Sequence, residues 1–189
     1  MSKEHILGAK IQSLRESKNI SREELAQRSG LTTQQIEHIE ENTNIPSLSP
    51  LIKIARVLGV RLGTFLDDSD KIGPVVSRKG ESTSTISTSN SSAGSHLDFY
   101  SLAAEKAGRH MEPFIIHIQS SKTKDFVMSS HEGEEFIYVL EGVIQISYGK
   151  DTFVLEEGDS IYYDSIVDHL VQAGGEQDAK ILAVVYAPF

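Results

Sequence analysis

Apolar side chains in the first 66 residues recur every three or four positions, which is the spacing along one face of an α-helix. The clearest run is Leu51, Ile54, Ala55 and Leu58, which ends at Gly59. Two earlier segments open with the capping-box pattern, in which a Ser or Thr is followed three residues later by Glu or Gln: Ser21–Glu24 and Thr32–Gln35. We therefore expect an all-α bundle of about five short helices between residues 5 and 66.

From Phe99 onward the pattern changes to short runs rich in Val, Ile, Phe and Tyr, separated by turn residues. The runs are PFIIHI (113–118), FIYVLEG (136–142), VIQISY (143–148), TFVLEEG (152–158), DSIYY (159–163) and KILAVVY (180–186). Short strands at even spacing are typical of an antiparallel sandwich or barrel. The second half is therefore predicted to be an all-β domain.

A polar segment separates the two patterns. Residues 81–95 contain ten Ser or Thr among fifteen residues. Such a segment buries too little apolar surface to offset its ordering entropy, which predicts a flexible linker or a long exposed loop. The expected organisation is a helical domain over residues 1–68, a linker over 69–97 and a β-domain over 98–189.

The second and third predicted helices satisfy the spacing of a helix-turn-helix. Counted from Arg22, a small residue at the helix crossing falls fifth (Ala26), a turn glycine ninth (Gly30), and apolar anchors fifteenth (Ile36) and eighteenth (Ile39). Over residues 5–66 the sequence resembles the phage-repressor/Cro-type (XRE) family. The resemblance implies that the N-terminal part of the third helix enters the major groove of double-stranded DNA.

This resemblance assigns the DNA-contacting positions. Thr33, Gln34 and His38 are expected to face base edges, where glutamine reads adenine and threonine meets a thymine methyl group. Arg22 is expected to contact phosphate. The full set of expected DNA-binding residues is Arg22, Thr32, Thr33, Gln34, Gln35, His38, Asn42 and Asn44. Glu41 and the absence of a basic residue in the following loop depart from the family, and the alternative is a helical unit that only packs or dimerises.

The distribution of charge fits a DNA-binding first half. The formal net charge is −9, but residues 1–66 hold nine Lys or Arg against seven Asp or Glu, whereas the remainder holds nine against twenty. Screening acts over about 8 Å at physiological salt, so DNA responds to the local balance of +2 in the first half. A balance this small predicts salt-sensitive binding of limited affinity.

Three residues in the β-domain have the spacing of a metal or ligand site. His131 and Glu135 stand four apart before Gly142, and His169 follows Gly158 by eleven residues. Residues 98–189 resemble the cupin family, whose barrel is a double-stranded β-helix or jelly roll. The family's first histidine falls at Ser129 here, and the Pro and Gly of its second motif fall at Asp164 and Ile166.

The resemblance implies a site formed by His131, Glu135 and His169. Two imidazoles and one carboxylate can hold Fe(II), and Zn, Mn or Ni are alternatives. The sequence has no cysteine, so a thiolate ligand is excluded. The alternative is a cupin without metal that binds an organic ligand through hydrogen bonds. Tyr162 and Tyr163 point to opposite faces of a strand, so one of them is expected in the pocket, and we assign Tyr163 to it.

Two functions of different classes are compatible with this domain pair. The first is a homodimeric transcriptional regulator that reads an inverted repeat and whose barrel senses a small-molecule effector. The second is a metal-dependent oxidoreductase, because the domain pair also resembles hydroxypropylphosphonate epoxidase. The lysine and tyrosine that grip substrate in that enzyme align with Asn19 and Leu102, although Lys18 and Tyr100 lie close by. The regulator is the preferred interpretation.

The sequence also favours a cytoplasmic protein that does not enter a membrane. The first ten residues lack the apolar core of a signal peptide. No apolar run approaches the roughly 20 residues that a membrane span requires.

Overall fold

The computed structural model describes residues 4–41, 47–66, 73–79, 86–89, 96–106, 108–120 and 128–188. The described helices are α1 (Glu4–Ser17), α2 (Arg22–Ser29), α3 (Thr33–Glu40), α4 (Leu48–Leu58) and α5 (Leu62–Leu66). The described strands are β1 (Ile86–Ser89), β2 (His96–Ser101), β3 (Met111–Ile118), β4 (Glu134–Glu141), β5 (Ile144–Tyr148), β6 (Asp151–Leu155), β7 (Ser160–Asp164), β8 (His169–Ala173) and β9 (Ala179–Tyr186). The predicted order of helices and then strands is confirmed. None of the described helices is long and apolar enough to cross a membrane.

Local sequence explains where α2 and α3 begin. The Thr32 side chain accepts a hydrogen bond from the Gln35 N–H, and the Gln35 side chain accepts one from the Thr32 N–H, which completes the predicted capping box of α3. At α2 the Ser21 hydroxyl accepts from the Glu24 N–H. The Glu24 carboxylate does not return the bond to the backbone, because it pairs with Arg28 one turn further on.

Both helical stops predicted at glycine are observed. Gly30 after α2 and Gly59 after α4 have φ values of 69° and 62°, in the left-handed region that glycine reaches without strain. A third glycine has a different purpose: a Cβ on Gly8 of α1 would lie 2.1 Å from the Glu40 carbonyl oxygen. The missing side chain therefore lets α1 approach the end of α3 closely.

The strands form a six-stranded sheet with the order β1-β2-β3-β9-β4-β7 and a three-stranded sheet with the order β6-β5-β8. Neighbouring strands run antiparallel. The inner positions of β3, β4 and β9 are buried, and their apolar side chains form the core together with those of β5. Examples are Phe114, Ile137, Ile146 and Ile181, which are at most 1% exposed.

The serine- and threonine-rich segment differs in part from the expected linker. Residues 86–89 within it form β1, the edge strand of the larger sheet, and pair with β2 in register. Pairing at a sheet edge requires backbone hydrogen bonds and β-compatible residues such as threonine, and it does not require an apolar side-chain pattern. Composition alone therefore missed this strand.

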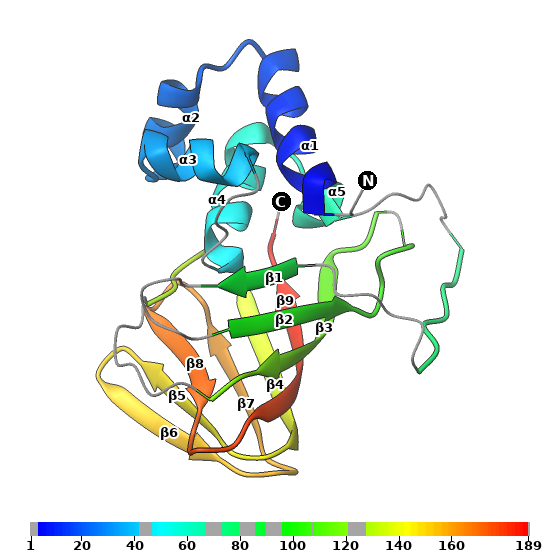
Figure 1. Cartoon of the computed structure of the whole chain (residues 1–189), viewed down its shortest axis with the longest axis vertical. Helices are drawn as coiled ribbons and strands as arrows, with labels where there is room; N and C mark the ends of the chain where they lie inside the picture. The colour runs from blue at the N-terminus through cyan, green and yellow to red at the C-terminus, as the bar shows by residue number, and fades with distance from the viewer. Residues whose placement is uncertain are drawn as a thin grey trace.

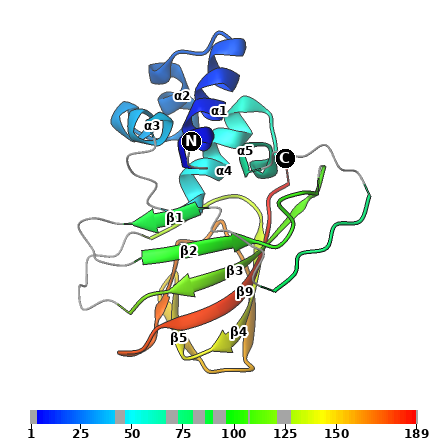
Figure 2. The same cartoon turned by 45° about the vertical axis from the view of Figure 1, so that its right-hand side comes forward.

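The helices gather at one end of the strands, as Figures 1 and 2 show from two directions. Within the helical domain, α4 extends towards the β-domain, whereas α2 lies on the far side. α4 also packs against α2, so the helix nearest the strands is in direct contact with the helix-turn-helix unit.

Candidate ligand site and candidate DNA-binding surface

Three side chains converge inside the β-domain. The Nε2 atoms of His131 and His169 lie 2.8 Å and 3.3 Å from the same Glu135 oxygen, Oε1. One ligand atom from each residue lies within 4.8 Å of the others, and all three residues are buried. The arrangement brings together the three residues that sequence spacing had singled out.

Each of the three residues reaches the site differently. Glu135 lies on the inner face of β4, and His169 is the first residue of β8. His131 precedes β4, and its N–H donates to the Ser165 carbonyl oxygen at 2.9 Å. Gly133 then turns the chain into β4 with φ of 111°, at a place where a Cβ would lie 1.9 Å from the Tyr186 carbonyl oxygen. His131 and Glu135 therefore meet across a glycine turn, because His131 lies before the start of β4.

Backbone carbonyl groups fix the orientation of both imidazoles. His131 Nδ1 lies 3.1 Å from the Glu132 carbonyl oxygen, and His169 Nδ1 lies 2.8 Å from that of Val167. The tautomer in which Nδ1–H donates to these carbonyls leaves a lone pair on each Nε2, facing the Glu135 carboxylate. A nitrogen lone pair that faces a carboxylate oxygen at 2.8–3.3 Å is repelled by it unless a proton or a cation lies between the two atoms. Hydrogen bonds from the outer ring nitrogen are also the usual support of metal-binding histidines. The donor set therefore fits a divalent metal ion.

Two hydroxyl groups complete the surroundings of the carboxylate. Tyr163 Oη donates to Glu135 Oε2 at 2.8 Å, and Ser165 Oγ donates to Oε1 at 3.2 Å. Tyr163, which was expected to line the ligand pocket, lies beside Glu135, while Tyr162 is 62% exposed. No pattern in the sequence pointed to Ser165. It is fully buried, and it also links to the Gly133 carbonyl oxygen through its own N–H.

Charge pairing dominates the ionisation of the site. Burial by itself raises the pKa of Glu135, but without a metal the Nε2 atoms of His131 and His169, when they carry protons, donate to its carboxylate and hold this pKa far below its usual range. Burial lowers the pKa of His169, but the hydrogen bond and charge of Glu135 raise it overall above its ordinary value. The pKa of Tyr163 is raised far beyond its ordinary value by burial and by the neighbouring charge of Glu135. Glu135 is thus ionised and Tyr163 is a neutral donor to it.

Other polar residues of the β-domain lie away from this cluster. His117 is on the outer face of β3, and its ring centroid lies 4.8 Å from that of Tyr100. His110 is exposed. Glu112 is buried, and its carboxylate accepts from Arg109 Nε at 2.7 Å.

The expected base-reading residues lie on an exposed surface. Thr33 and Gln34 are exposed in the first turn of α3, and Thr32 and Gln35, also exposed, form its cap. His38, one turn further along, is half-buried. Ile36 and Ile39 bury the opposite side of the helix in the core. Asn42 and Asn44 lie outside the described residues.

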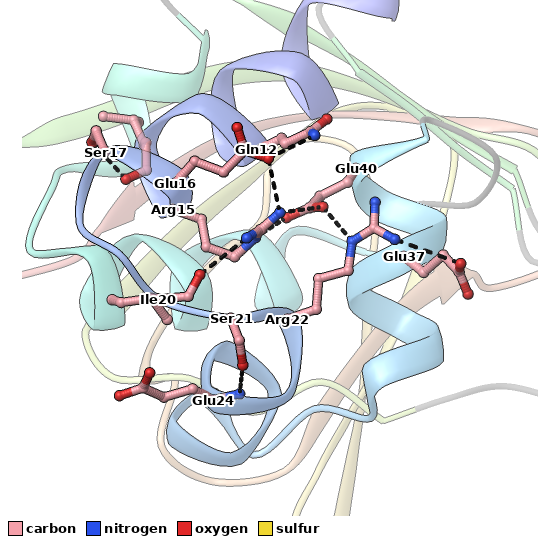
Figure 3. Close-up of polar contacts among 11 residues, drawn as sticks. Gln12, Arg15, Glu16, Ser17, Ile20, Ser21, Arg22, Glu24, Glu37 and Glu40 are labelled. Atoms are coloured by element: carbon pink, nitrogen blue, oxygen red, sulfur yellow. Dashed lines mark hydrogen bonds and ion pairs between the residues drawn. The ribbon is translucent and has the colours of Figure 1, made fainter.

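Arg22, the expected phosphate contact, belongs to a buried ionic network (Figure 3). Its Nε donates to Glu40 Oε2 at 2.7 Å, and its Nη1 lies 3.6 Å from Glu37 Oε1. Arg15 donates to the same Glu40 carboxylate, from Nε at 2.6 Å and from Nη2 at 3.1 Å. The Arg22 side chain is 31% exposed, so it is only partly available to another molecule.

Comparison with known protein families agrees with both halves of the structure. Residues 11–65 match the helix-turn-helix family, and residues 116–185 match the cupin domain family. The chain joins a helix-turn-helix domain to a cupin domain. The cluster of His131, Glu135 and His169 lies within the cupin match, and the exposed surface of α3 lies within the helix-turn-helix match.

The same domain pair occurs in proteins of similar length. The chain is 23% identical over 182 residues to the HTH-type transcriptional regulator SutR of Escherichia coli (strain K12). The aligned residues cover 96% of this chain and 95% of SutR. A crystal structure of an HTH_3 family transcriptional regulator from Vibrio cholerae superposes with a TM-score of 0.65 and 22% identity, covering 99% and 97% of the two chains. The Fe(II) form of HppE, a hydroxypropylphosphonic acid epoxidase, superposes with a TM-score of 0.53 and 24% identity, covering 95% and 96%. At these identities the structural similarities establish the fold.

Proposed function

We propose that this protein is a sequence-specific DNA-binding transcriptional regulator whose cupin domain binds a small-molecule effector. The observation that carries the proposal is the first turn of α3, which presents Thr33 and Gln34 to solvent while Ile36 and Ile39 anchor the helix from behind. This is the arrangement by which a helix-turn-helix reads the major groove. The names of SutR and of the Vibrio cholerae protein support the same class. Such a regulator works in the cytoplasm, where the chromosome lies.

The residues of this surface have distinct proposed roles. Gln34 reads an adenine through its amide, and Thr33 and His38 contact neighbouring base edges. Arg22 contributes positive charge at the start of α2, with its guanidinium held by Glu40. The wider contact set is Thr32, Gln35, Asn42 and Asn44.

We propose that His131, Glu135 and His169 hold a divalent metal ion, which is Fe, Zn, Mn or Ni. The support is the convergence of both Nε2 atoms on Glu135, with both Nδ1 atoms facing backbone carbonyl groups. A metal held by these three residues would supply a Lewis acid to bind an oxygen or nitrogen atom of the effector. Tyr163 and Ser165 hold the Glu135 carboxylate in place.

The regulator is proposed to act as a homodimer on an inverted repeat. One small helix-turn-helix contacts few phosphates, and two copies related by a twofold axis read half-sites about one helical turn apart. The outer face of β3, β9, β4 and β7 offers a surface for pairing. Its side chains are largely apolar across the register of the sheet: Pro113, Val184, Phe136 and Tyr162 in one row, and Ile115, Leu182 and Tyr138 in the next.

A metal-dependent oxidoreductase is the second candidate function, because the chain shares its fold with HppE. The residues aligned with its substrate-gripping pair do not favour it. Asn19 takes the place of the lysine, in an exposed turn with φ of 55°. Leu102 takes the place of the tyrosine, and the nearby Tyr100 pairs with Ile115 in the sheet register and so faces outward, away from the triad. The regulator is therefore preferred.

Selection from random double-stranded DNA tests the regulator directly. We expect an enriched inverted repeat bound by the wild type. Gln34→Ala should lose about 1–3 kcal/mol of specific binding and relax the preference at one base pair in each half-site. The measurement is the Kd for the enriched site and for its single-base variants at fixed salt concentration.

Gln12→Ala provides the matched control, since Gln12 lies on α1 and hydrogen-bonds Glu16 there. This variant should retain the wild-type base preference. If no sequence is enriched, or if Gln34→Ala keeps the full preference of the wild type, the proposed function is wrong.

A further inference from the structure

The loop that contains His131 is in contact with the helix-turn-helix domain. Ser49 in the first turn of α4 donates a hydrogen bond from Oγ to the Ser130 carbonyl oxygen at 2.8 Å. Arg56, two turns further along α4, forms an ion pair with Glu132. The residues on either side of His131 are therefore both held by the same helix.

The contact at Ser49 is partly buried, whereas the contact at Arg56 is exposed. Ser49 is 4% exposed, so its hydroxyl has little access to water in place of the Ser130 carbonyl oxygen. The side chains of Arg56 and Glu132 are 58% and 36% exposed, so this ion pair contributes little stability and mainly favours one orientation. The stronger mechanical link is the one beside His131.

The same loop is tightly joined to the rest of the ligand site. Ser129 exchanges two backbone hydrogen bonds with His169, at 2.7 Å and 2.9 Å. Ser130 Oγ donates to the Ile166 carbonyl oxygen at 3.2 Å. With Gly133 packed against Tyr186, the loop has little freedom to move by itself. A change in the position of His131 must therefore displace the residues that α4 holds.

From α4 the path to the DNA-binding surface is short. α4 packs against α2, and its first residue, Leu48, follows the last residue of α3, Glu40, by eight positions. Eight of the eleven residues of α4 are buried, so the helix moves with the helical core. A shift of α4 thus changes the placement of α2 and α3.

We propose that residues 129–133, clamped by Ser49 and Arg56, are the element through which occupancy of the His131–Glu135–His169 site changes the helix-turn-helix domain. This inference rests on the proposed function, because it takes the triad as the ligand site and α3 as the DNA-binding helix. Zn²⁺ alone is the ion added to occupy the site in the test, because it suits a His₂Glu donor set and undergoes no redox change.

Amide hydrogen exchange of the full chain with and without Zn²⁺ tests the proposal without knowledge of the operator. In the wild type, Zn²⁺ should slow exchange in residues 129–133 and also in α4, by about 5-fold or more if the coupling is of the usual size. The double variant Ser49→Ala, Glu132→Gln should keep the slowing in the loop and lose it in α4. The Glu132 carbonyl group that faces His131 remains in this variant, so the metal site is preserved.

Arg61→Ala is the matched control. Arg61 donates from Nη1 to the Gly108 carbonyl oxygen at 2.6 Å, which joins the same two domains without touching residues 129–133. This variant should behave as the wild type does. If Zn²⁺ still slows amide exchange in α4 of the double variant, the loop is not the coupling element. The same conclusion follows if Arg61→Ala also loses the slowing in α4.

Two further outcomes separate this proposal from the one on which it rests. If Zn²⁺ slows the loop but not α4 in the wild type, the metal site is supported and the coupling is overturned. If Zn²⁺ leaves the loop unchanged, both the metal site and the coupling are overturned. Neither outcome changes the DNA selection experiment, which tests α3 independently. Circular dichroism and Zn²⁺ affinity of each variant establish that it is folded.

Discussion

At the scale of single residues, Glu134 and Glu135 show how one position in a strand decides the role of a carboxylate. Glu135 faces inward to the two histidines, whereas Glu134 faces outward and accepts a hydrogen bond from Tyr162. Glu135→Gln removes the charge from the inner carboxylate and should lower Zn²⁺ affinity by about 100-fold or more, because even the loss of a supporting residue around a metal costs 10- to 100-fold.

Glu134→Gln makes the same chemical change on the outer face and should leave Zn²⁺ affinity at the wild-type value. Titration calorimetry on both variants provides the comparison. Equal affinities in the two variants would show that Glu135 is not a metal ligand.

The sequence identified the three main residues of the site but not their supports. His131, Glu135 and His169 have the spacing of the cupin motifs, which is visible in the sequence. Ser165 has no such pattern, since it reaches Glu135 from a loop 30 residues away and its hydroxyl chemistry is common at any surface. The carbonyl groups that orient the histidines are backbone atoms, which sequence does not distinguish. Supports of this kind become visible only when the loops are placed in space.

At the scale of secondary-structure elements, the capping box at Thr32–Gln35 was predictable because it depends on residues three apart. The ionic network among α1, α2 and α3 was not, because Arg15 and Glu40 are 25 positions apart. The two acids Glu37 and Glu40 on α3 are therefore structural partners of arginine, and their charge is largely balanced.

Removal of the Glu40 carboxylate should destabilise the helical domain strongly. The side chain of Glu40 is fully buried and that of Arg15 is 9% exposed. Glu40→Ala therefore leaves the buried guanidinium with only the exposed Glu16 carboxylate, 3.5 Å away, as a counter-charge. Breaking a buried pair in this way costs about 3–5 kcal/mol of unfolding free energy. Urea denaturation followed by circular dichroism measures the loss.

Glu24→Ala is the comparison for this change, since Glu24 forms an exposed pair with Arg28 on α2. It should cost no more than about 0.5 kcal/mol. Similar losses in the two variants would contradict a special role for the network. The result also bears on Arg22, because a variant at Arg22 loses a donor to Glu40 as well as any phosphate contact, and its DNA affinity has to be compared at equal fraction folded.

At the scale of the whole molecule, the sequence predicted two domains but not how they meet. Ser49, Arg56 and Arg61 have no feature that marks them as interdomain contacts, since each contact joins residues at least 47 positions apart. The sheet face proposed for pairing was equally hidden, because a continuous apolar run in a strand is normally interpreted as a strand buried on both faces. Only the strand order shows that one of these sides forms the outer surface.

The pairing of two copies through this face can be tested at one of its exposed side chains. Tyr138 lies on the outer face of β4, opposite Leu182 in the register, and is 38% exposed. In a twofold interface a charge placed there meets its own copy or nearby apolar side chains, and it is buried without a partner. Tyr138→Glu should therefore convert a dimer into a monomer at micromolar concentration and weaken binding to the inverted repeat. Sedimentation velocity gives the oligomeric state.

Phe153→Glu separates this face from other exposed apolar surface, since Phe153 lies on β6 of the three-stranded sheet and is 42% exposed. The variant should remain dimeric, because the proposed interface is confined to the six-stranded sheet.

A stable dimer uses about 800 Å² of each partner, which one row of side chains does not provide. The two adjoining rows across β3, β9, β4 and β7 must therefore act together. A monomeric wild type would rule out the dimer, and a monomeric Phe153→Glu variant beside a dimeric Tyr138→Glu variant would move the interface to the smaller sheet.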